Sequence, residues 1–362
     1  MSTSTLPRHL VASPGEILEE WIAEHDMTQR ELADRLGKSE KFVSQLMNAK
    51  ASLTPDTAQE LELVTRVSAA TWLRIEGEYR STIKRTELVA TAAASPIEAA
   101  LVKVLRNLGV VTAPAGARGE QTIQVWKLLG VGSPQGLESL GRRRAAQFRT
   151  SATFAPDAVA TEVVIALAHL EAAQMSVATL NLARLRAAVP RLRALTLLGA
   201  VEGSAQARTM LADVGVALVF LPNVPKAHCN GVTLWSGDHA IIAVTDRGRR
   251  EDIFWFTLFH ELSHVLDGDR NAIYLDSRAG DAEPLDAERR ADAFATELLI
   301  PLKDEPWLHA ISALADIPAV ARKLGVSPGV LVGQLHHREL KPFSWGNRFI
   351  ERIETGRSDG VD

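Results

Sequence analysis

The sequence predicts a multidomain protein that is mainly α-helical with one small β-sheet. Its first 85 residues contain a series of short, clearly capped helical patterns, which are typical of an all-α bundle. After Gly215, three short apolar runs precede two helical patterns, which predicts a C-terminal α+β domain. A chain of 362 residues, 46% of them hydrophobic, can form two or three domains with separate cores.

Five helices are expected in the N-terminal bundle. The first begins at Pro14, because proline is favoured in the first turn of a helix. Thr28–Glu31 reads as a capping box, and the second helix that it opens ends before Gly37. The other three helices begin after residues that can cap them with a side-chain hydroxyl, namely Ser39, Thr54 and Ser68.

We divide the chain into a bundle over residues 12–85, a helical middle region over 86–205 and an α+β domain over 206–353. The stretch 91–96 (TAAASP) is interpreted as a linker. In the third region, VALVFLP, GVTLW and AIIAV predict three strands of a small sheet. Two helices are expected after them, over residues 251–266 and 286–299.

Composition excludes several classes of protein. No apolar stretch approaches the ~20 residues that a membrane span needs, so we expect no membrane partner. A single cysteine, Cys229, excludes an internal disulfide framework and favours a cytoplasmic location. The net charge of −4 gives no global basic field that would attract nucleic acid.

Four residues in the bundle have the spacing of a helix-turn-helix. Ala33 is the small residue where two helices cross, Gly37 forms the turn, and Val43 and Leu46 anchor the second helix. The wider stretch PGEILEEW…MTQRELADRLGKSEKFVSQLMNAK…LTPDTA resembles the phage-repressor-like (XRE) family, and within it the HigA-type antitoxins. This resemblance covers about residues 12–80 and implies binding to an operator in double-stranded DNA.

By family position, three residues match base-facing sites and three match phosphate contacts: Glu40, Lys41 and Gln45, and Gln29, Asn48 and Lys50. Residues 28–50 hold five Lys and Arg against three Asp and Glu, so the local charge is only weakly positive. We therefore expect modest affinity for one subunit, and DNA binding by a homodimer. The alternative is a helix-turn-helix kept as a protein-docking module.

The motif His260-Glu-Leu-Ser-His264 lies in the helix expected over residues 251–266. At about 100° per residue, His264 lies about 40° round from His260, and Glu261 about 100° round. Two imidazoles and a carboxylate thus share one face, as in zinc sites in which a glutamate holds the attacking water. The alternative is a pair of core histidines bonded to nearby carbonyl groups.

Zinc needs a third protein ligand, and Glu288 is the best candidate. In PLDAERRADAFATELLIP, Glu288 shares a helix face with apolar residues that point to the core, while Asp292 can accept from the outer N–H of a ligand histidine. Asp267 and Asp269 are weaker rivals, and Glu288 could instead be a solvated partner of a basic residue. This pattern favours a zincin-like domain of the gluzincin kind.

The segments FWFTLFHELSHVL and AERRADAFATELLIP resemble the ImmA/IrrE family of metallopeptidase-like proteins, over about residues 200–345. The resemblance implies zinc on the two histidines and Glu288, and Glu261 as general base. It also implies a regulator acting in stress or mobile-element control by cutting a protein or peptide substrate, such as a repressor or a toxin.

In this chain the DNA-binding domain is fused to the peptidase-like domain, whereas the family resemblance implies a separate protease. The substrate could therefore also be the chain itself. The rival hypothesis is a HigA-like antitoxin or repressor whose metal domain is structural or sensory. Tyr274, His228 and His239 are candidates for stabilising the oxyanion. Residues 231–235 could pair with an extended substrate as an edge strand.

Overall fold

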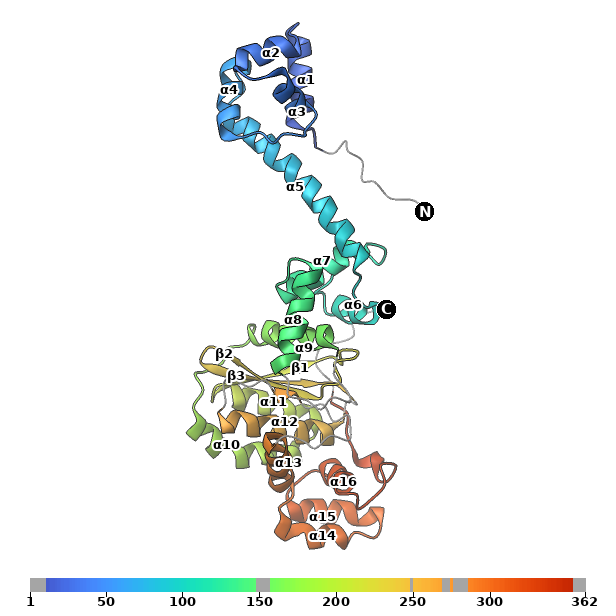
Figure 1. The fold of residues 1–362 in the computed structure, drawn as a ribbon. Coiled ribbons are helices and arrows are strands. Elements are labelled where there is room, and N and C mark those ends of the chain that lie inside the picture. Colours follow the sequence, from blue (N-terminus) through green and yellow to red (C-terminus); the bar gives the residue numbers. More distant parts are fainter. Residues whose placement is uncertain (1–10, 148–156, 248–249, 269–273, 276–285, 354–362) are drawn as a thin grey trace. The chain divides into compact units, whose positions relative to one another are not determined.

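A computed structural model describes residues 11–147, 157–247, 250–268, 274–275 and 286–353 (Figure 1). The chain divides into two compact units. Unit 1 comprises residues 1–96 and 113–123, and unit 2 comprises residues 97–112 and 124–362. The predicted fold class is confirmed, since the protein is mainly helical with one small sheet, which lies in the C-terminal domain.

Unit 1 begins with five helices whose starts are those expected from the sequence: α1 (Pro14–Glu24), α2 (Gln29–Leu36), α3 (Glu40–Met47), α4 (Pro55–Thr65) and α5 (Ala69–Ala94). Their core contains Leu18, Leu32, Leu61 and Trp72, each at most 1% exposed. Apolar residues at helical spacing therefore build this core from every helix of the bundle.

Two local predictions for this bundle differ from the structure. Thr28 accepts a hydrogen bond from the backbone N–H of Glu31, but the Glu31 side chain pairs with Arg35, so the capping box is only half formed. A complete capping box occurs at Ser13 and Glu16 instead. Helix α5 also continues to Ala94, because residues 91–94 are good helix formers and no glycine or proline interrupts them.

Among the described residues, no single helix is long and apolar enough to cross a membrane. Helices α5 and α6 (Ala99–Asn107) pass that test of length and composition only when they are taken together.

The sheet of unit 2 has the strand order β1-β3-β2-β4, with β1 (Val216–Leu221), β2 (Gly231–Ser236), β3 (His239–Thr245) and β4 (Tyr274–Leu275). β1 runs parallel to β3, whereas β2 runs antiparallel to both β3 and β4. The first three strands are the predicted ones. The two-residue β4 was not predicted, because it is too short to show an alternating pattern.

Both faces of this sheet are buried, as the continuous apolar runs of β1 and β3 require. Alternate residues such as Ala217 and Val219 pack on α6 and α9 (Ala158–Ala172), on one face. Their neighbours Val216 and Leu218 pack on the other face, on α10 (Leu182–Ala194), α11 (Ala200–Ala212) and α12 (Glu251–Asp267). Helices from the predicted middle region thus share cores with the sheet (Figure 1).

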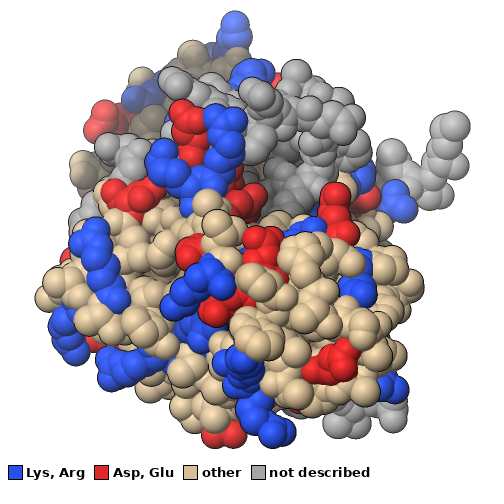
Figure 2. Space-filling model, turned by 90° about the horizontal axis from the view of Figure 1, so that it is seen from below, with Lys and Arg blue, Asp and Glu red and all other residues tan. Residues whose placement is uncertain are grey.

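Unit 2 contains further α-helices. They are α7 (Arg118–Leu129, whose first turns belong to unit 1), α8 (Pro134–Gln147), α13 (Asp286–Leu299), α14 (Glu305–His309), α15 (Ile317–Leu324) and α16 (Pro328–His337). Helices α13 to α16 pack around α12, which is buried along most of its length. On the face of unit 2 seen from the α14–α16 end, basic and acidic side chains are interspersed (Figure 2).

Candidate functional site

Helix α12 brings the two motif histidines to one buried point. His260 and His264 are 2% and 1% exposed, and their Nε2 atoms lie 3.3 Å apart. The spacing of four residues on a helix puts them on adjacent turns of one face. Since Phe259, Leu262 and Val265 pack the remaining faces into the core, the orientation of α12 is fixed by burial.

Helix α13 supplies the carboxylate. Glu288 Oε2 lies 3.0 Å from Nε2 of His260, and Glu288 Oε1 lies 3.4 Å from Nε2 of His264. Burial by itself would raise the pKa of Glu288, but hydrogen bonds and charge interactions with both histidines outweigh it and lower the pKa to about 2. Glu288 is therefore ionised at neutral pH, which is the form that binds a cation.

Asp292, one turn further along α13, orients His260. Its Oδ1 accepts a hydrogen bond from Nδ1 of His260 at 2.9 Å. With the proton on Nδ1, the Nε2 of a neutral His260 ring presents a lone pair towards the carboxylate of Glu288. Two electron-donating atoms facing each other at 3.0 Å are satisfied by a cation that binds both.

The donor set consequently fits a metal ion. His260, His264 and Glu288 each offer one ligand atom, and these atoms lie within 4.8 Å of one another. Two imidazole nitrogens and one carboxylate oxygen are a ligand set of catalytic zinc sites, which leave a fourth position open. The hydrogen bond from His260 to Asp292 is the outer contact that such ligands usually make.

Glu261 is fully buried beside this cluster and contacts strand β2. Its Oε2 accepts a hydrogen bond of 2.6 Å from Thr233 Oγ1. A Cβ at Gly231 would lie 2.7 Å from Oε1 of Glu261, so the absence of a side chain there lets β2 approach α12. Neither Gly231 nor Thr233 was predicted. The only sequence signal was that they alternate with the core residues Val232 and Leu234.

The other ligand candidates lie outside this cluster. Asp267 forms an ion pair of 3.2 Å with Arg290, and Arg289 pairs with Asp286 rather than with Glu288. Asp269 lies outside the described residues.

Of the three oxyanion candidates, His239 begins β3 and lies 3.5 Å from Asp238, while His228 lies in the loop before β2 with a positive φ of 47°. The side chain of Tyr274 lies outside what the structure describes. The prediction that residues 231–235 form an edge strand is wrong, since β4 pairs with Val232 and Thr233. A substrate strand cannot use backbone groups that β4 already occupies.

In unit 1, α2 and α3 form a helix-turn-helix. Gly37 takes the left-handed conformation (φ 62°) that ends α2, and Ser39 caps α3 by accepting from the N–H of Phe42. A Cβ at Gly15 would collide with the carbonyl of Met47, so α1 can cross the end of α3 only because this residue is glycine.

Most residues predicted to contact DNA have exposed side chains, namely Glu40, Lys41, Gln45, Asn48 and Lys50, whereas Gln29 is half-buried. Two of them also make local contacts. Glu40 lies 3.4 Å from Arg30, and Asn48 donates to the carbonyl of Ser44 at 2.8 Å. The exposed face of α3 is thus polar and carries both signs of charge.

Two family models match this chain, one within each unit. Residues 18–72 match a family model described as Helix-turn-helix, and residues 213–336 match a peptidase family model described as IrrE N-terminal-like domain. No curated protein matches the chain significantly. A solved structure titled as that of a hypothetical protein from E. coli is 28% identical, with 22% of this chain and 76% of that chain covered and a TM-score of 0.19. The chain thus carries an XRE-type helix-turn-helix domain followed by an IrrE-like, metallopeptidase-like domain.

Proposed function

We propose that this protein is a DNA-binding transcription regulator whose IrrE-like domain is a zinc endopeptidase. Its substrate is a repressor, a toxin or another partner protein, or the chain itself. The observation that carries the proposal is the convergence of His260, His264 and Glu288 within 4.8 Å of one another, beside the buried Glu261. Two histidines that served only to pack the core would not need a carboxylate facing both of their rings, as Glu288 does.

When bound, zinc supplies a Lewis acid that polarises the substrate carbonyl and acidifies water. The residues of the chain provide the rest. Glu261 accepts a proton from water, and its hydrogen bond to Thr233 fixes which way its carboxylate faces. Asp292 holds the ring of His260 in one orientation. The buried setting of α12 strengthens these electrostatic interactions, because little water screens them.

A second candidate function is a HigA-like antitoxin or repressor whose metal domain is structural or sensory and not proteolytic. One observation favours it: both ring nitrogens of His260 lie within 3.0 Å of carboxylates, those of Asp292 and Glu288. A doubly protonated His260 could donate to both, and the cluster would then be an ion-pair network that needs no metal.

For DNA binding, the proposal is a homodimer that places the N-terminal end of each α3 in a major groove. Lys41 and Gln45 would face base edges. Asn48, at the end of α3, and Lys50, two residues further on, are exposed and would contact phosphates. Glu40 repels phosphate and can accept from cytosine, so it would contribute to sequence selection rather than to general affinity.

The test of proteolysis is a comparison of wild type with Glu261→Gln, incubated with zinc and with candidate repressors, toxins and the chain itself. The variant cannot take a proton at neutral pH, so cleavage should fall at least ~10²-fold while zinc is retained. Glu202→Gln, on the exposed surface of α11, is the matched control and should cleave as wild type does. Identical promoter regulation by wild type and Glu261→Gln in cells under every stress tried would favour the antitoxin-like function.

A further inference from the structure

A groove runs along α12 on the turn that precedes the metal cluster. It has a volume of about 190 Å³ between α12 and α16, and its lining includes Asn230, Phe256, Thr257, His337 and Phe343. Phe256 and Thr257 each lie four residues before His260 and Glu261, so the groove begins about one helical turn, or 5.4 Å along the axis, from the candidate ligands.

The groove also lies close to strand β2, which contacts Glu261. Gly231, which approaches Glu261, also approaches Thr257, because a Cβ there would lie 2.5 Å from Thr257 Cγ2. Asn230, next to Gly231 in sequence, lines the groove. The groove and the metal cluster therefore share helix α12, and Gly231 lies close both to Thr257 of the groove and to Glu261.

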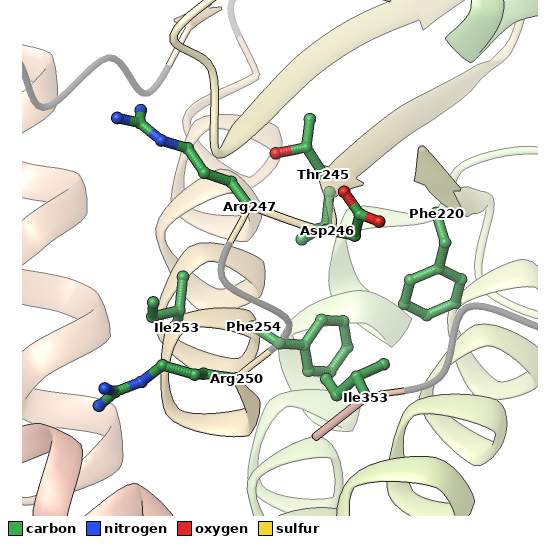
Figure 3. Close-up of a pocket in the computed structure, with 9 residues that line it drawn as sticks. Phe220, Thr245, Asp246, Arg247, Arg250, Ile253, Phe254 and Ile353 are labelled. Atoms are coloured by element: carbon green, nitrogen blue, oxygen red, sulfur yellow. The ribbon is translucent and has the colours of Figure 1, made fainter. Parts of the chain in front are cut away.

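A second hollow lies at the carboxyl ends of β1 and β3 (Figure 3). It is smaller, about 20 Å³, and Phe220, Phe254 and Ile353 gather on one side of it, while the guanidinium of Arg250 points away (Figure 3). Its α12 residues, Ile253 and Phe254, lie at least six residues before His260, so this hollow is further from the metal cluster than the groove is. We therefore argue only from the groove.

Aromatic rings form part of the walls of the groove. The ring of Phe256 lies 4.7 Å from that of His337 and 6.4 Å from that of His260, so rings lead from the groove to the metal cluster. Phe343, whose ring lies 5.4 Å from that of His336, is 73% exposed. Its exposed ring offers apolar surface beside the hollow on which an aromatic side chain can pack.

The charged groups of the groove do not call for a charged ligand. Arg250 donates through Nε and a terminal nitrogen to the two carboxylate oxygens of Asp252, at 3.0 and 2.7 Å. This bidentate pair neutralises the charge at that end. The groove is thus suited to an uncharged, flat side chain that can pack on rings.

We propose that this groove binds an aromatic side chain of the protein segment being cleaved, at a residue next to the scissile bond. The inference rests on the proposed peptidase function. An extended chain advances about 3.3 Å per residue, so a side chain one residue from the metal-bound carbonyl spans the distance of one helical turn. Phe256 and Phe343 would determine specificity by packing on the two faces of that ring.

The first test needs no metal. Methyl NMR of the full-length, metal-free protein would follow Ile253, which lines the groove, during titration with N-acetyl-phenylalanine methylamide or the alanine analogue. The phenylalanine compound should shift the signal and the alanine compound should not. Phe343→Ala should weaken the effect several-fold. The matched control is Leu302→Ala, another exposed apolar residue of unit 2 (67% exposed), which should not weaken it. Equal shifts with both compounds, or no effect of Phe343→Ala, would overturn the proposal.

The second test separates the groove from the peptidase function. Peptide hydroxamates, extended in either chain direction from the metal-binding group, would carry methyl or benzyl side chains next to it. Zinc-loaded protein should bind the benzyl compounds at least about tenfold more tightly in one direction, and Phe343→Ala should remove that gain. If no hydroxamate binds but the phenylalanine compound still shifts Ile253, the metal function fails and the groove stands. If methyl and benzyl compounds bind alike in both directions, the groove assignment is wrong.

Discussion

Two helix pairs of this chain share one local geometry and differ in what surrounds them. In each pair, an eight-residue helix (α2 or α15) ends at a left-handed glycine, Gly37 with φ 62° or Gly325 with φ 67°. In each, a serine two residues later, Ser39 or Ser327, caps the second helix. However, α3 buries two of its eight residues, whereas α16 buries seven of its ten.

The difference lies in the side chains at equivalent positions. Counted from the turn glycine, Lys41 and Gln45 of α3 correspond to Gly329 and Gly333 of α16. Lys41 and Gln45 are exposed and can reach a partner. A Cβ at Gly333 would collide with the Cβ of Asp252, so glycine there allows α16 to lie flat against α12.

A helix-turn-helix therefore specifies a shape, and its exposed residues decide its use. The first pair presents polar side chains to solvent, as a DNA-reading helix must. The second pair packs against the helix that carries His260 and His264, and the face seen in Figure 2 mixes both signs of charge rather than forming a basic stripe. The burial of α16 makes this second pair part of the core of unit 2.

A large effect on stability should come from breaking the close contact of the second pair. Gly333→Ala should destabilise unit 2 by about 1–3 kcal/mol, because the added methyl group overpacks α16 against α12. Gly77→Ala, in α5 with nothing near its Cβ, should instead stabilise unit 1 by about 0.5–1 kcal/mol. Chemical unfolding followed by circular dichroism measures both. Equal stability of Gly333→Ala and wild type would contradict the close packing.

The start of α12 should make unit 2 sensitive to pH. Burial of Glu251, which accepts from Ser327 of the α16 cap, raises its pKa from 4.5 to about 7. The protonated form is therefore favoured in the folded state. Its contribution is complete below about pH 4.5 and is lost as pH rises through 7, by on the order of 3 kcal/mol.

Urea unfolding at pH 5 and pH 8 measures this loss, and Glu251→Gln should remove it. The pKa of Glu288 is lowered to about 2, so this residue stabilises unit 2 above about pH 4.5 and loses that contribution only as the pH falls further. It therefore does not disturb the comparison. A wild type that is as stable at pH 8 as at pH 5 would show that Glu251 is not buried as described.

In the first pair, replacing an exposed residue of α3 should change DNA specificity without changing the stability of unit 1. Gln45→Ala should relax selection at one base pair per half-site and cost ~1–3 kcal/mol there, because an exposed side chain loses only its contact with the base edge. Binding of the full-length protein to selected operators and their single-base variants measures this effect. Retained discrimination at every position would show that Gln45 does not read bases.

Lys50→Ala should have the smallest effect, spread over all DNA sequences. Removing one phosphate contact should lower the slope of log affinity against log salt by about one. The matched control is Lys84→Ala, on the exposed part of α5, which should leave the slope unchanged. If both variants behave alike, Lys50 does not contact a phosphate.

Much of this architecture could be predicted from local chemistry. Hydroxyl caps, turn glycines and apolar spacing determined the starts of α1 to α5, since these signals act within a few residues. The same reasoning paired Glu288 and Asp292 with the motif histidines, because a helix places residues four apart on one face.

The rest depends on contacts between distant segments. Thr233 and Gly231 contact Glu261 only because β2 lies on α12, and nothing in the local pattern of β2 indicates this. The edge-strand prediction failed because two residues, Tyr274 and Leu275, suffice to pair with β2. The helical continuation of α5 through Ala94 shows a limit of composition, since alanine and threonine can form either a linker or a helix.

The metal content of the purified full-length protein, prepared without chelators, tests the central claim most directly. We predict about one zinc per chain for wild type and for Glu261→Gln, whose side chain is not a ligand. His264→Ala, which removes a ligand, should contain almost none. Wild-type protein that contains no zinc and takes none up on addition would contradict the account, and α12 would then carry a metal-free ion-pair network.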